Sequence, residues 1–333
     1  MKIILPVAGK GTRLRPHTFS KPKSLMSVAG KTVLSHIIES LLKINGAEFI
    51  FIVDEKGDVI KDFVNKKYDI DAEYVVQSEQ LGPSHAVWLA KDFVKDGDDV
   101  LVVFNDTIAV TDYSKITEQC EDWDGMIYVC RTSDPQRFGI VDRDEDKSIK
   151  RIVEKPKEYI GDLAVVGAYY FKDGPAFMEA CGEMIKKEQI ERGEYYMNFP
   201  IYSLIKNGAK FRAKMVDLWL DCGKPETLLE TNKGLLAMNC ITKGVQFLND
   251  SLIFPPVYIA ESAIVRNSLI GPNVSIGEGV NVSDCKITNS IVDDGAILEG
   301  INLGDSIIGQ NASALGNARR LNIGDHSVVD FRK

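Results

Sequence analysis

Through about the first 240 residues, short apolar runs alternate with longer stretches in which apolar residues recur every three or four positions. Short apolar runs predict strands, and the longer periodicity predicts amphipathic helices. The expected strands cover 2–7, 49–53, 73–77 and 99–104, and the expected helices cover 33–45, 57–66 and 83–95. This alternation favours a largely parallel sheet covered by helices. Because ligands bind such sheets beyond the carboxyl ends of the strands, we expect a site at that edge.

The pattern changes between about residues 125 and 171, where strand-like runs follow one another without intervening helices. The runs are 126–130, 138–142, 149–154 and 165–171. They suggest an inserted lobe that could cover a second ligand. Helical periodicity returns at 173–190 and 198–206, and a last helix is expected at about 225–238.

From about residue 250, short units with one aliphatic position recur. Ile264, Ile270, Ile276 and Val282 stand six residues apart. Hexapeptide repeats of this kind are typical of a parallel β-helix whose coils stack aliphatic residues inside. Three six-residue sides make one coil, so about 75 residues predict about four coils. The units after Val282 slip from this spacing, which leaves their register open.

Composition narrows the class of protein. The net charge is -8 and the pI about 5.2, so a nucleic-acid partner is not indicated. No apolar run reaches the roughly 20 residues of a membrane span, and the N-terminal apolar run is too short for a secretory signal. The six cysteines form no CxxC pair, and the four histidines lack metal-site spacing. We expect reduced thiols, a cytoplasmic protein, and histidines with structural or peripheral roles.

The densest cluster of candidate chemistry lies in residues 7–25, directly after the first expected strand. Two glycines, Gly9 and Gly11, precede a basic stretch. That stretch contains Arg13, Arg15, Lys21 and Lys23. A glycine-rich turn after a strand presents backbone N–H groups to an anion, and arginine adds a planar fork of donors. In an acidic chain this local positive charge predicts a site for a small polyphosphate.

These residues carry a resemblance to a known family. Gly11-Thr12-Arg13-Leu14-Arg15-Pro16-His17-Thr18 and Lys21-Pro22-Lys23 resemble the signature of the sugar-1-phosphate nucleotidylyltransferases. The resemblance covers residues 1 to about 235. It implies an α/β fold with a Rossmann-like mixed sheet, followed here by a short left-handed parallel β-helix. The chain has Ala8 where the family usually has glycine, as in uridylyltransferases that act on glucose 1-phosphate.

The resemblance assigns the nucleotide side of the site. The loop Ala8, Gly9, Gly11, Thr12 and Arg13 would hold the phosphates, and Lys23 would contact the phosphates of both substrates. Gln77 and Gly82 would face the base. A glutamine side chain offers one donor and one acceptor, which matches the edge of uracil or thymine. Gly82 would let the backbone approach the base closely.

Two carboxylates are expected to hold a metal ion. Asp106 and Asp221 each follow an apolar run, and in the family these positions bind Mg²⁺. Carboxylates together with phosphate oxygens suit that ion. The catalytic residues would then be Arg13, Lys23 and Asp106. The family commonly has glycine where this chain has Asn105, and aspartates at strand ends also cap turns, which is the competing interpretation of both residues.

The sugar phosphate would lie against a further group of residues. Glu154-Lys155-Pro156 and Phe138-Gly139 match family elements, with the glutamate for sugar hydroxyls, the lysine for phosphate and the glycine for access to the ring. Further positions match as well. The complete set is Lys23, Gly139, Glu154, Lys155, Val165, Tyr169 and Arg192.

The function predicted from the resemblance is Mg²⁺-dependent transfer of a nucleotidyl group from dTTP or UTP to a hexose 1-phosphate, most simply glucose 1-phosphate. Three alternatives stay open: a mannose-1-phosphate guanylyltransferase, a non-catalytic regulatory relative, and a bifunctional enzyme with an acyltransferase tail. The expected partners are a nucleoside triphosphate, a sugar 1-phosphate and other copies of the chain through the β-helix. The expected domains are 1–240, catalytic, and 241–333, the β-helix.

Overall fold

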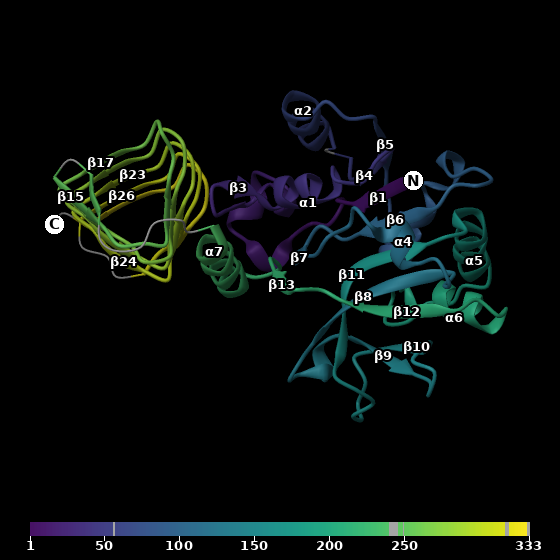
Figure 1. Ribbon diagram of the computed structural model, residues 1–333. Helices are drawn as coiled ribbons and strands as arrows, with labels where there is room; N and C mark the ends of the chain where they lie inside the picture. Colours follow the sequence, from purple (N-terminus) through teal and green to yellow (C-terminus); the bar gives the residue numbers. More distant parts are fainter. Residues whose placement is uncertain (56, 240–245, 249, 317–319, 332–333) are drawn as a thin grey trace. The chain divides into compact units, whose positions relative to one another are not determined.

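The computed structural model describes residues 1–55, 57–239, 246–248, 250–316 and 320–331. The chain forms two compact units (Figure 1). The first contains Met1–Gly9 and Ile37–Trp219, and the second contains Lys10–His36 and Leu220–Lys333. The signature loop from Lys10 onward therefore belongs to the same unit as the C-terminal repeats. The predicted division at residues 240 and 241 stays a prediction.

The first unit is built on a nine-stranded mixed sheet, with a main strand order of β10-β9-β11-β6-β1-β4-β5. Its first strands along the chain are β1 (Lys2–Pro6), β4 (Glu48–Val53), β5 (Ala72–Val76) and β6 (Val100–Val103). The pairs β1–β4, β4–β5 and β1–β6 are parallel. The next strands are β8 (Gly125–Arg131), β9 (Gly139–Arg143), β10 (Ile149–Glu154), β11 (Leu163–Phe171) and β12 (Phe211–Met215). β11 runs antiparallel to both β6 and β8.

The helices follow the expected pattern, apart from a short helix at 116–119 that was not predicted and the early end of the one expected at 83–95. They are α1 (Val33–Leu41), α2 (Asp58–Lys67), α3 (Pro83–Trp88), α4 (Ile116–Gln119), α5 (Gly174–Lys186), α6 (Asn198–Lys206) and α7 (Pro225–Asn239). The helix predicted over 83–95 ends at Trp88 and is followed by a 3-10 turn, η4 (Lys91–Phe93). The N–H of Ala90 already donates to Val87, three residues back, so the α-helical ladder has tightened there.

The strand-rich segment 125–171 divides its strands between two roles. β8 and β11 extend the main sheet, whereas β9 and β10 form an antiparallel pair joined to it through β11. One buried core of this unit lies between the sheet and helices α3, α5 and α6. Phe171 and Phe177 stack inside this core with ring centroids 3.6 Å apart. The sheet thus supplies a rigid base from which loops leave at the strand ends.

The signature loop of the second unit consists of short elements. Three 3-10 turns, η1 (Thr12–Leu14), η2 (His17–Phe19) and η3 (Lys23–Leu25), precede the two-stranded hairpin of β2 (Ser27–Val28) and β3 (Lys31–Thr32). The boundaries between the units fall after Gly9, within α1 and within β13 (Leu218–Asp221). One further short strand, β7 (Thr107–Val110), follows β6 in the first unit.

The C-terminal repeats form three five-stranded sheets, which confirms the predicted β-helix-like architecture. The first sheet contains β14 (Gln246–Leu248), β15 (Ser251–Ile253), β18 (Leu269–Ile270), β21 (Lys286–Thr288) and β24 (Asn302–Gly304). The second contains β16 (Val257–Ile259), β19 (Val274–Ile276), β22 (Ser290–Val292), β25 (Ile307–Ile308) and β27 (Asn322–Ile323). The third contains β17 (Ile264–Arg266), β20 (Asn281–Ser283), β23 (Ile297–Glu299), β26 (Ser313–Gly316) and β28 (Val328–Phe331). Apart from the antiparallel pair β14–β15, neighbouring strands in these sheets are parallel.

In the β-helix, one predicted inward position and the predicted length of a coil are wrong. Ile270, Ile276 and Val282 are fully buried as predicted, but Ile264 is 44% exposed and Val265 lies inside in its place. Residues that form hydrogen bonds between neighbouring coils are 15 to 17 positions apart, rather than the 18 that three hexapeptides would give. Shorter corners therefore cause the slips in the repeat, and the stack has five levels where about four were expected. No helix among the described residues is long and apolar enough to cross a membrane.

Candidate active site

Two candidate segments of the first unit lie at one edge of the sheet. Because β1 and β6 are adjacent and parallel, Ala8 and Gly9 after β1 lie at the same edge as Asp106 after β6. Ala8 is buried, and its carbonyl oxygen accepts a hydrogen bond from Gln80 Nε2 at 2.6 Å. This contact joins the start of the glycine-rich loop to the segment that follows β5. The edge predicted from the alternating pattern therefore does gather these residues.

The candidate base-reading residue Gln77 is held from two sides. Its backbone N–H donates to the carbonyl of Val53 at 2.8 Å, which extends the ladder between β4 and β5. Its side chain is 5% exposed, and Nε2 lies 3.3 Å from Nδ1 of His85 on α3. Burial lowers the pKa of His85, against a smaller opposite effect of Glu79. A neutral His85 accepts the amide proton and leaves Oε1 of Gln77 as an acceptor.

Gly82 occupies a backbone conformation that only glycine adopts readily. Its φ is +108°, and a Cβ there would lie 2.6 Å from the backbone nitrogen of Tyr195. The N–H of Tyr195 donates to Leu81 at 2.8 Å, and the carbonyl of Tyr195 accepts from Ser84 at 2.9 Å. The segment around Tyr195, three residues after Arg192, is thereby fixed against the loop between β5 and α3.

Three sugar-side candidates meet on β9, β10 and β11. Gly139 and Glu154 are direct partners in the antiparallel pair of β9 and β10. A Cβ on Gly139 would lie 3.1 Å from Glu154 Oε2 and 3.9 Å from a methyl group of Val165. The missing side chain at Gly139 therefore leaves space directly beside the Glu154 carboxylate. A hydroxyl-rich ligand could approach the carboxylate through this gap.

The electrostatics around Glu154 connect the remaining sugar-side candidates. Burial raises the pKa of Glu154, while Lys155 and, more weakly, Arg192 oppose the shift. Lys155 Nζ lies 3.5 Å from Glu154 Oε1. Burial also raises the pKa of Tyr169, and the charges of Glu154 and Asp106 add to that shift. The structure thus brings Asp106, Glu154 and Tyr169 into one electrostatic neighbourhood within the first unit.

In the second unit, Gly11 and Lys23 are packed against each other. Gly11 has a φ of +59°, and a Cβ there would lie 2.9 Å from Cβ of Lys23. Thr18 Oγ1 donates to the carbonyl of Gly11 at 2.7 Å. The loop therefore folds back on itself so that Lys23 lies beside the turn that begins η1. This arrangement requires glycine at position 11, since any side chain there would collide with Lys23 and Thr18.

Arg13 and Asp221 also belong to this unit and meet at Gly223. A Cβ on Gly223 would lie 3.0 Å from Asp221 Oδ1 and 3.1 Å from Arg13 Nη2. The N–H of Gly223 donates to Asp221 Oδ1 at 2.8 Å, and Thr231 Oγ1 donates to the carbonyl of Asp221 at 2.9 Å. Asp221 is thus oriented by its own turn and by α7, with the Arg13 guanidinium beside the same glycine.

The carboxylates fit a hard divalent cation by their chemistry. Asp106 belongs to the first unit and Asp221 to the second, and each supplies oxygen ligands. Asp221 Oδ1 is already engaged by Gly223. Over the part of the chain that the structure describes, no group of three or more His, Cys, Asp or Glu side chains is arranged to hold a metal. A cation bound by either carboxylate would take its other ligands from phosphate and water.

Sequence reasoning missed two residues next to the candidate site. His85 contacts Gln77 across a loop of the chain, and no local spacing signals that contact. Gly223 was not singled out, although both Arg13 and Asp221 lie beside it. Both roles depend on which segments fold together, so the pattern of residues along the chain does not reveal them.

With this geometry described, the comparisons with known proteins become informative. The chain matches the nucleotidyl transferase family over residues 1–238. It is 31% identical over 99% of both chains to the low-salt glycan biosynthesis nucleotidyltransferase Agl11 of Haloferax volcanii. It is 29% identical over 100% of both chains to a glucose-1-phosphate thymidylyltransferase of Streptomyces antibioticus. The fold is similar to that of a solved UDP-glucose pyrophosphorylase from Acinetobacter baumanii, with a TM-score of 0.61, 21% identity and coverage of 72% of this chain and 94% of that one.

The chain belongs to the nucleotidyl transferase family, whose members commonly use a divalent metal. Within that family it is an enzyme of sugar-1-phosphate nucleotidyl transfer, as the signature motifs predicted. The individual site residues and the substrates within this class stay predictions.

Proposed function

We propose that this enzyme transfers a nucleotidyl group from dTTP or UTP to glucose 1-phosphate and releases pyrophosphate. The observation that carries this proposal is the buried carboxamide of Gln77, which donates to His85 and so presents Oε1 and a second N–H. Those two groups match the N3–H donor and a carbonyl acceptor of uracil or thymine. The thymidylyltransferase from Streptomyces antibioticus, similar over its whole length, supports the same substrate class.

The phosphates are proposed to bind the signature loop. Arg13, with the amides of Gly9, Gly11 and Thr12, would hold the triphosphate, and Lys23 would contact both the transferred phosphate and the sugar phosphate. The sugar phosphate oxygen is already ionised at neutral pH, so it attacks the α-phosphorus in line without a protein base. The bond to pyrophosphate breaks as the new one forms. Catalysis then consists of positioning the substrates and neutralising their charge, and the side chains of Arg13 and Lys23 would do both.

The sugar is proposed to lie against Gly139, Glu154, Val165 and Tyr169, with its phosphate toward Lys155 and Arg192. The gap at Gly139 beside the Glu154 carboxylate supports this assignment because a carboxylate accepts hydrogen bonds from adjacent sugar hydroxyls. Asp106 and Asp221 would hold Mg²⁺. When bound, that ion would withdraw charge from the phosphate oxygens and help to retain pyrophosphate.

The organisation of the chain is part of the proposal. Residues 1–240 would form the catalytic domain, and 241–333 would form a β-helix domain through which copies of the chain associate. We also propose that the enzyme works in the cytoplasm, where the free thiols of its described cysteines would stay reduced.

A substrate panel tests the proposed function. Purified enzyme with Mg²⁺ is incubated with dTTP, UTP, GTP, CTP or ATP, each against glucose, galactose, mannose and N-acetylglucosamine 1-phosphates, and pyrophosphate release is measured. We expect the highest kcat/KM for glucose 1-phosphate with dTTP or UTP. A preference for GTP with mannose 1-phosphate would contradict the proposal. Acetyl-CoA with glucosamine 1-phosphate serves as a further control and is expected to give no acetyl transfer.

A further inference from the structure

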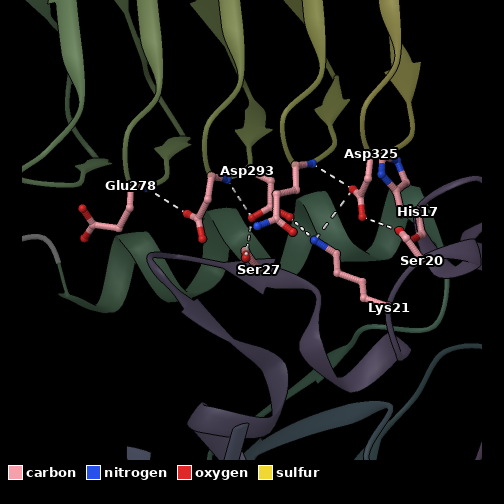
Figure 2. A network of polar contacts seen from close by, with 9 residues as sticks. His17, Ser20, Lys21, Ser27, Glu278, Asp293 and Asp325 are labelled. Atoms are coloured by element: carbon pink, nitrogen blue, oxygen red, sulfur yellow. Dashed lines mark hydrogen bonds and ion pairs between the residues drawn. The ribbon is translucent and has the colours of Figure 1, made fainter. Parts of the chain in front are cut away.

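The part of the signature loop between Arg13 and the β2–β3 hairpin lies against corners of the β-helix within the second unit (Figure 2). These corners join the second sheet of the β-helix to its third. The register of the coils makes Ala260, Gly277, Asp293, Gly309 and Gly324 equivalent corner residues. Four of them are alanine or glycine, so Asp293 is the exception. The coil itself does not require a carboxylate at this position.

The Asp293 carboxylate binds the signature loop through both oxygens. Oδ2 pairs with Nζ of Lys21, and Oδ1 accepts a hydrogen bond from Ser27 Oγ at 2.9 Å. Lys21 also lies 3.9 Å from Asp325 Oδ1, two coils further along the stack. The side chains of Lys21, Asp293 and Asp325 are only 14%, 7% and 4% exposed. Little water screens this group, so removing one partner would leave the other charge buried and unpaired, which costs more than the loss of a surface ion pair.

Two further contacts fix the same stretch of the loop. Ser20 Oγ donates to Asp325 Oδ2, and His17 Nε2 lies 2.5 Å from Oδ1 of Asn322. The bound residues therefore stand on both sides of Lys23, with Lys21 two positions before it and Ser27 four positions after it. The elements between them are single 3-10 turns and a two-residue strand, which cannot hold a position by their own hydrogen bonds.

From these contacts we infer that Lys21 is a positioning residue, which acts by joining the signature loop to Asp293 and Asp325 so that Lys23 and Arg13 are presented correctly to the phosphates. This inference rests on the proposed function for its catalytic consequence. The two lysines of the Lys21-Pro22-Lys23 motif then have different roles: Lys21 binds the β-helix, and Lys23 contacts the phosphates. It also gives two coils of the repeat region, those of β22 and β27, a role in positioning the signature loop.

A double-mutant cycle with Lys21→Met and Asp293→Ala tests the inference. Alanine is compatible with the corner because Ala260 occupies the equivalent position. We expect each variant to lower kcat by about 10- to 100-fold, because a displacement of about 1 Å at the reacting groups costs that much. The double variant should lose no more than the worse single variant, since both changes break one contact. Lys21→Arg should restore much of the activity.

The opposite pattern would overturn the inference. If Lys21 bound phosphate directly, Asp293→Ala would free its charge, so kcat would be kept and KM for the nucleotide would fall. Additive losses in the double variant would equally contradict the shared role. Glu278→Gln is the matched control, because Glu278 directly follows the corner residue Gly277 but hydrogen-bonds Ser262 at an exposed position of the β-helix. This variant should keep kcat and both KM values.

Amide hydrogen exchange provides a readout that does not depend on activity. Lys21→Met and Asp293→Ala should speed exchange over residues 12–28, and Glu278→Gln should not. Unchanged exchange in that segment would overturn the inference, as would faster exchange with unaltered kcat. If the wild-type enzyme transferred no nucleotide with any substrate pair, the proposed function would fail, while the exchange data would still decide whether Lys21 holds the loop.

Discussion

The two units position their candidate residues by different means. In the first unit, Gln77, Gly139 and Glu154 stand on or directly beside strands, and backbone ladders fix them. In the second unit, Arg13 and Lys23 stand on a loop of 3-10 turns whose position depends on side chains of the β-helix. A ladder spreads its stabilisation over many bonds, whereas the loop depends on a few buried polar contacts. The loop should therefore be the more sensitive of the two to single substitutions.

The largest effect is expected for Lys23→Ala on the loop. Removing a cation that faces the transferred phosphate should lower kcat by about 10²- to 10³-fold. The thermal unfolding midpoint should stay close to that of the wild type. Steady-state kinetics and a thermal melt check both expectations, with Lys31→Ala in the same unit as the control variant. Near-normal turnover in the Lys23 variant would show that the loop does not carry the chemistry.

The next largest effect is expected at Gly82, where the first unit depends on one backbone conformation. Gly82→Ala should lower the free energy of unfolding by about 1–3 kcal/mol, because the residue has a φ of +108° and the new Cβ would collide with Tyr195. Gly208→Ala is the matched control. It also has a positive φ, of +98°, but its Cβ would meet nothing within 4 Å. Urea unfolding measures both, and equal losses would show that the contact with Tyr195 adds nothing.

A smaller effect, with a definite sign, is expected from Glu154→Gln. Burial raises the pKa of Glu154 in the folded protein, so ionising this carboxyl costs stability. That cost is absent below the ordinary pKa of glutamate and develops as pH rises through the raised value. The variant should therefore gain stability relative to the wild type between about pH 4 and pH 8, although its KM for the sugar phosphate should rise. Thermal melts across that range would contradict this if the gain shrank with pH.

The smallest effect is expected at an exposed corner of the β-helix. Asp305 accepts a hydrogen bond from Asn289 at 2.5 Å, and its φ is +50°, which asparagine also adopts. Asp305→Asn should change the free energy of unfolding by no more than about 0.5 kcal/mol and leave kcat unaltered. Chemical denaturation and a turnover assay check this. A large loss would mean that an exposed corner contact of the β-helix matters as much as the buried contacts of Asp293.

Much of the fold was predictable because its signals are local. Apolar runs identified every strand of the main sheet except β12, and three- to four-residue periodicity identified α1, α2, α5, α6 and α7. The six-residue repeat identified the β-helix, but not its register, because corners of unequal length shift the inward positions. This is why Val265, and not Ile264, lies inside. Strand pairing also brings the sugar-side candidates Gly139 and Glu154 together, and their roles stay a prediction.

The sequence by itself determined the class of protein and the residue types available for its chemistry, because motifs and periodicity are local properties of the chain. Only the tertiary structure decided that residues 10–36 belong with the repeats and that Lys21 is bound to Asp293 and Asp325. Lys21 and Asp293 are separated by 272 positions and share no periodic relation. Side-chain partners at such a distance depend on how coils and loops pack, and no pattern along the chain records that packing.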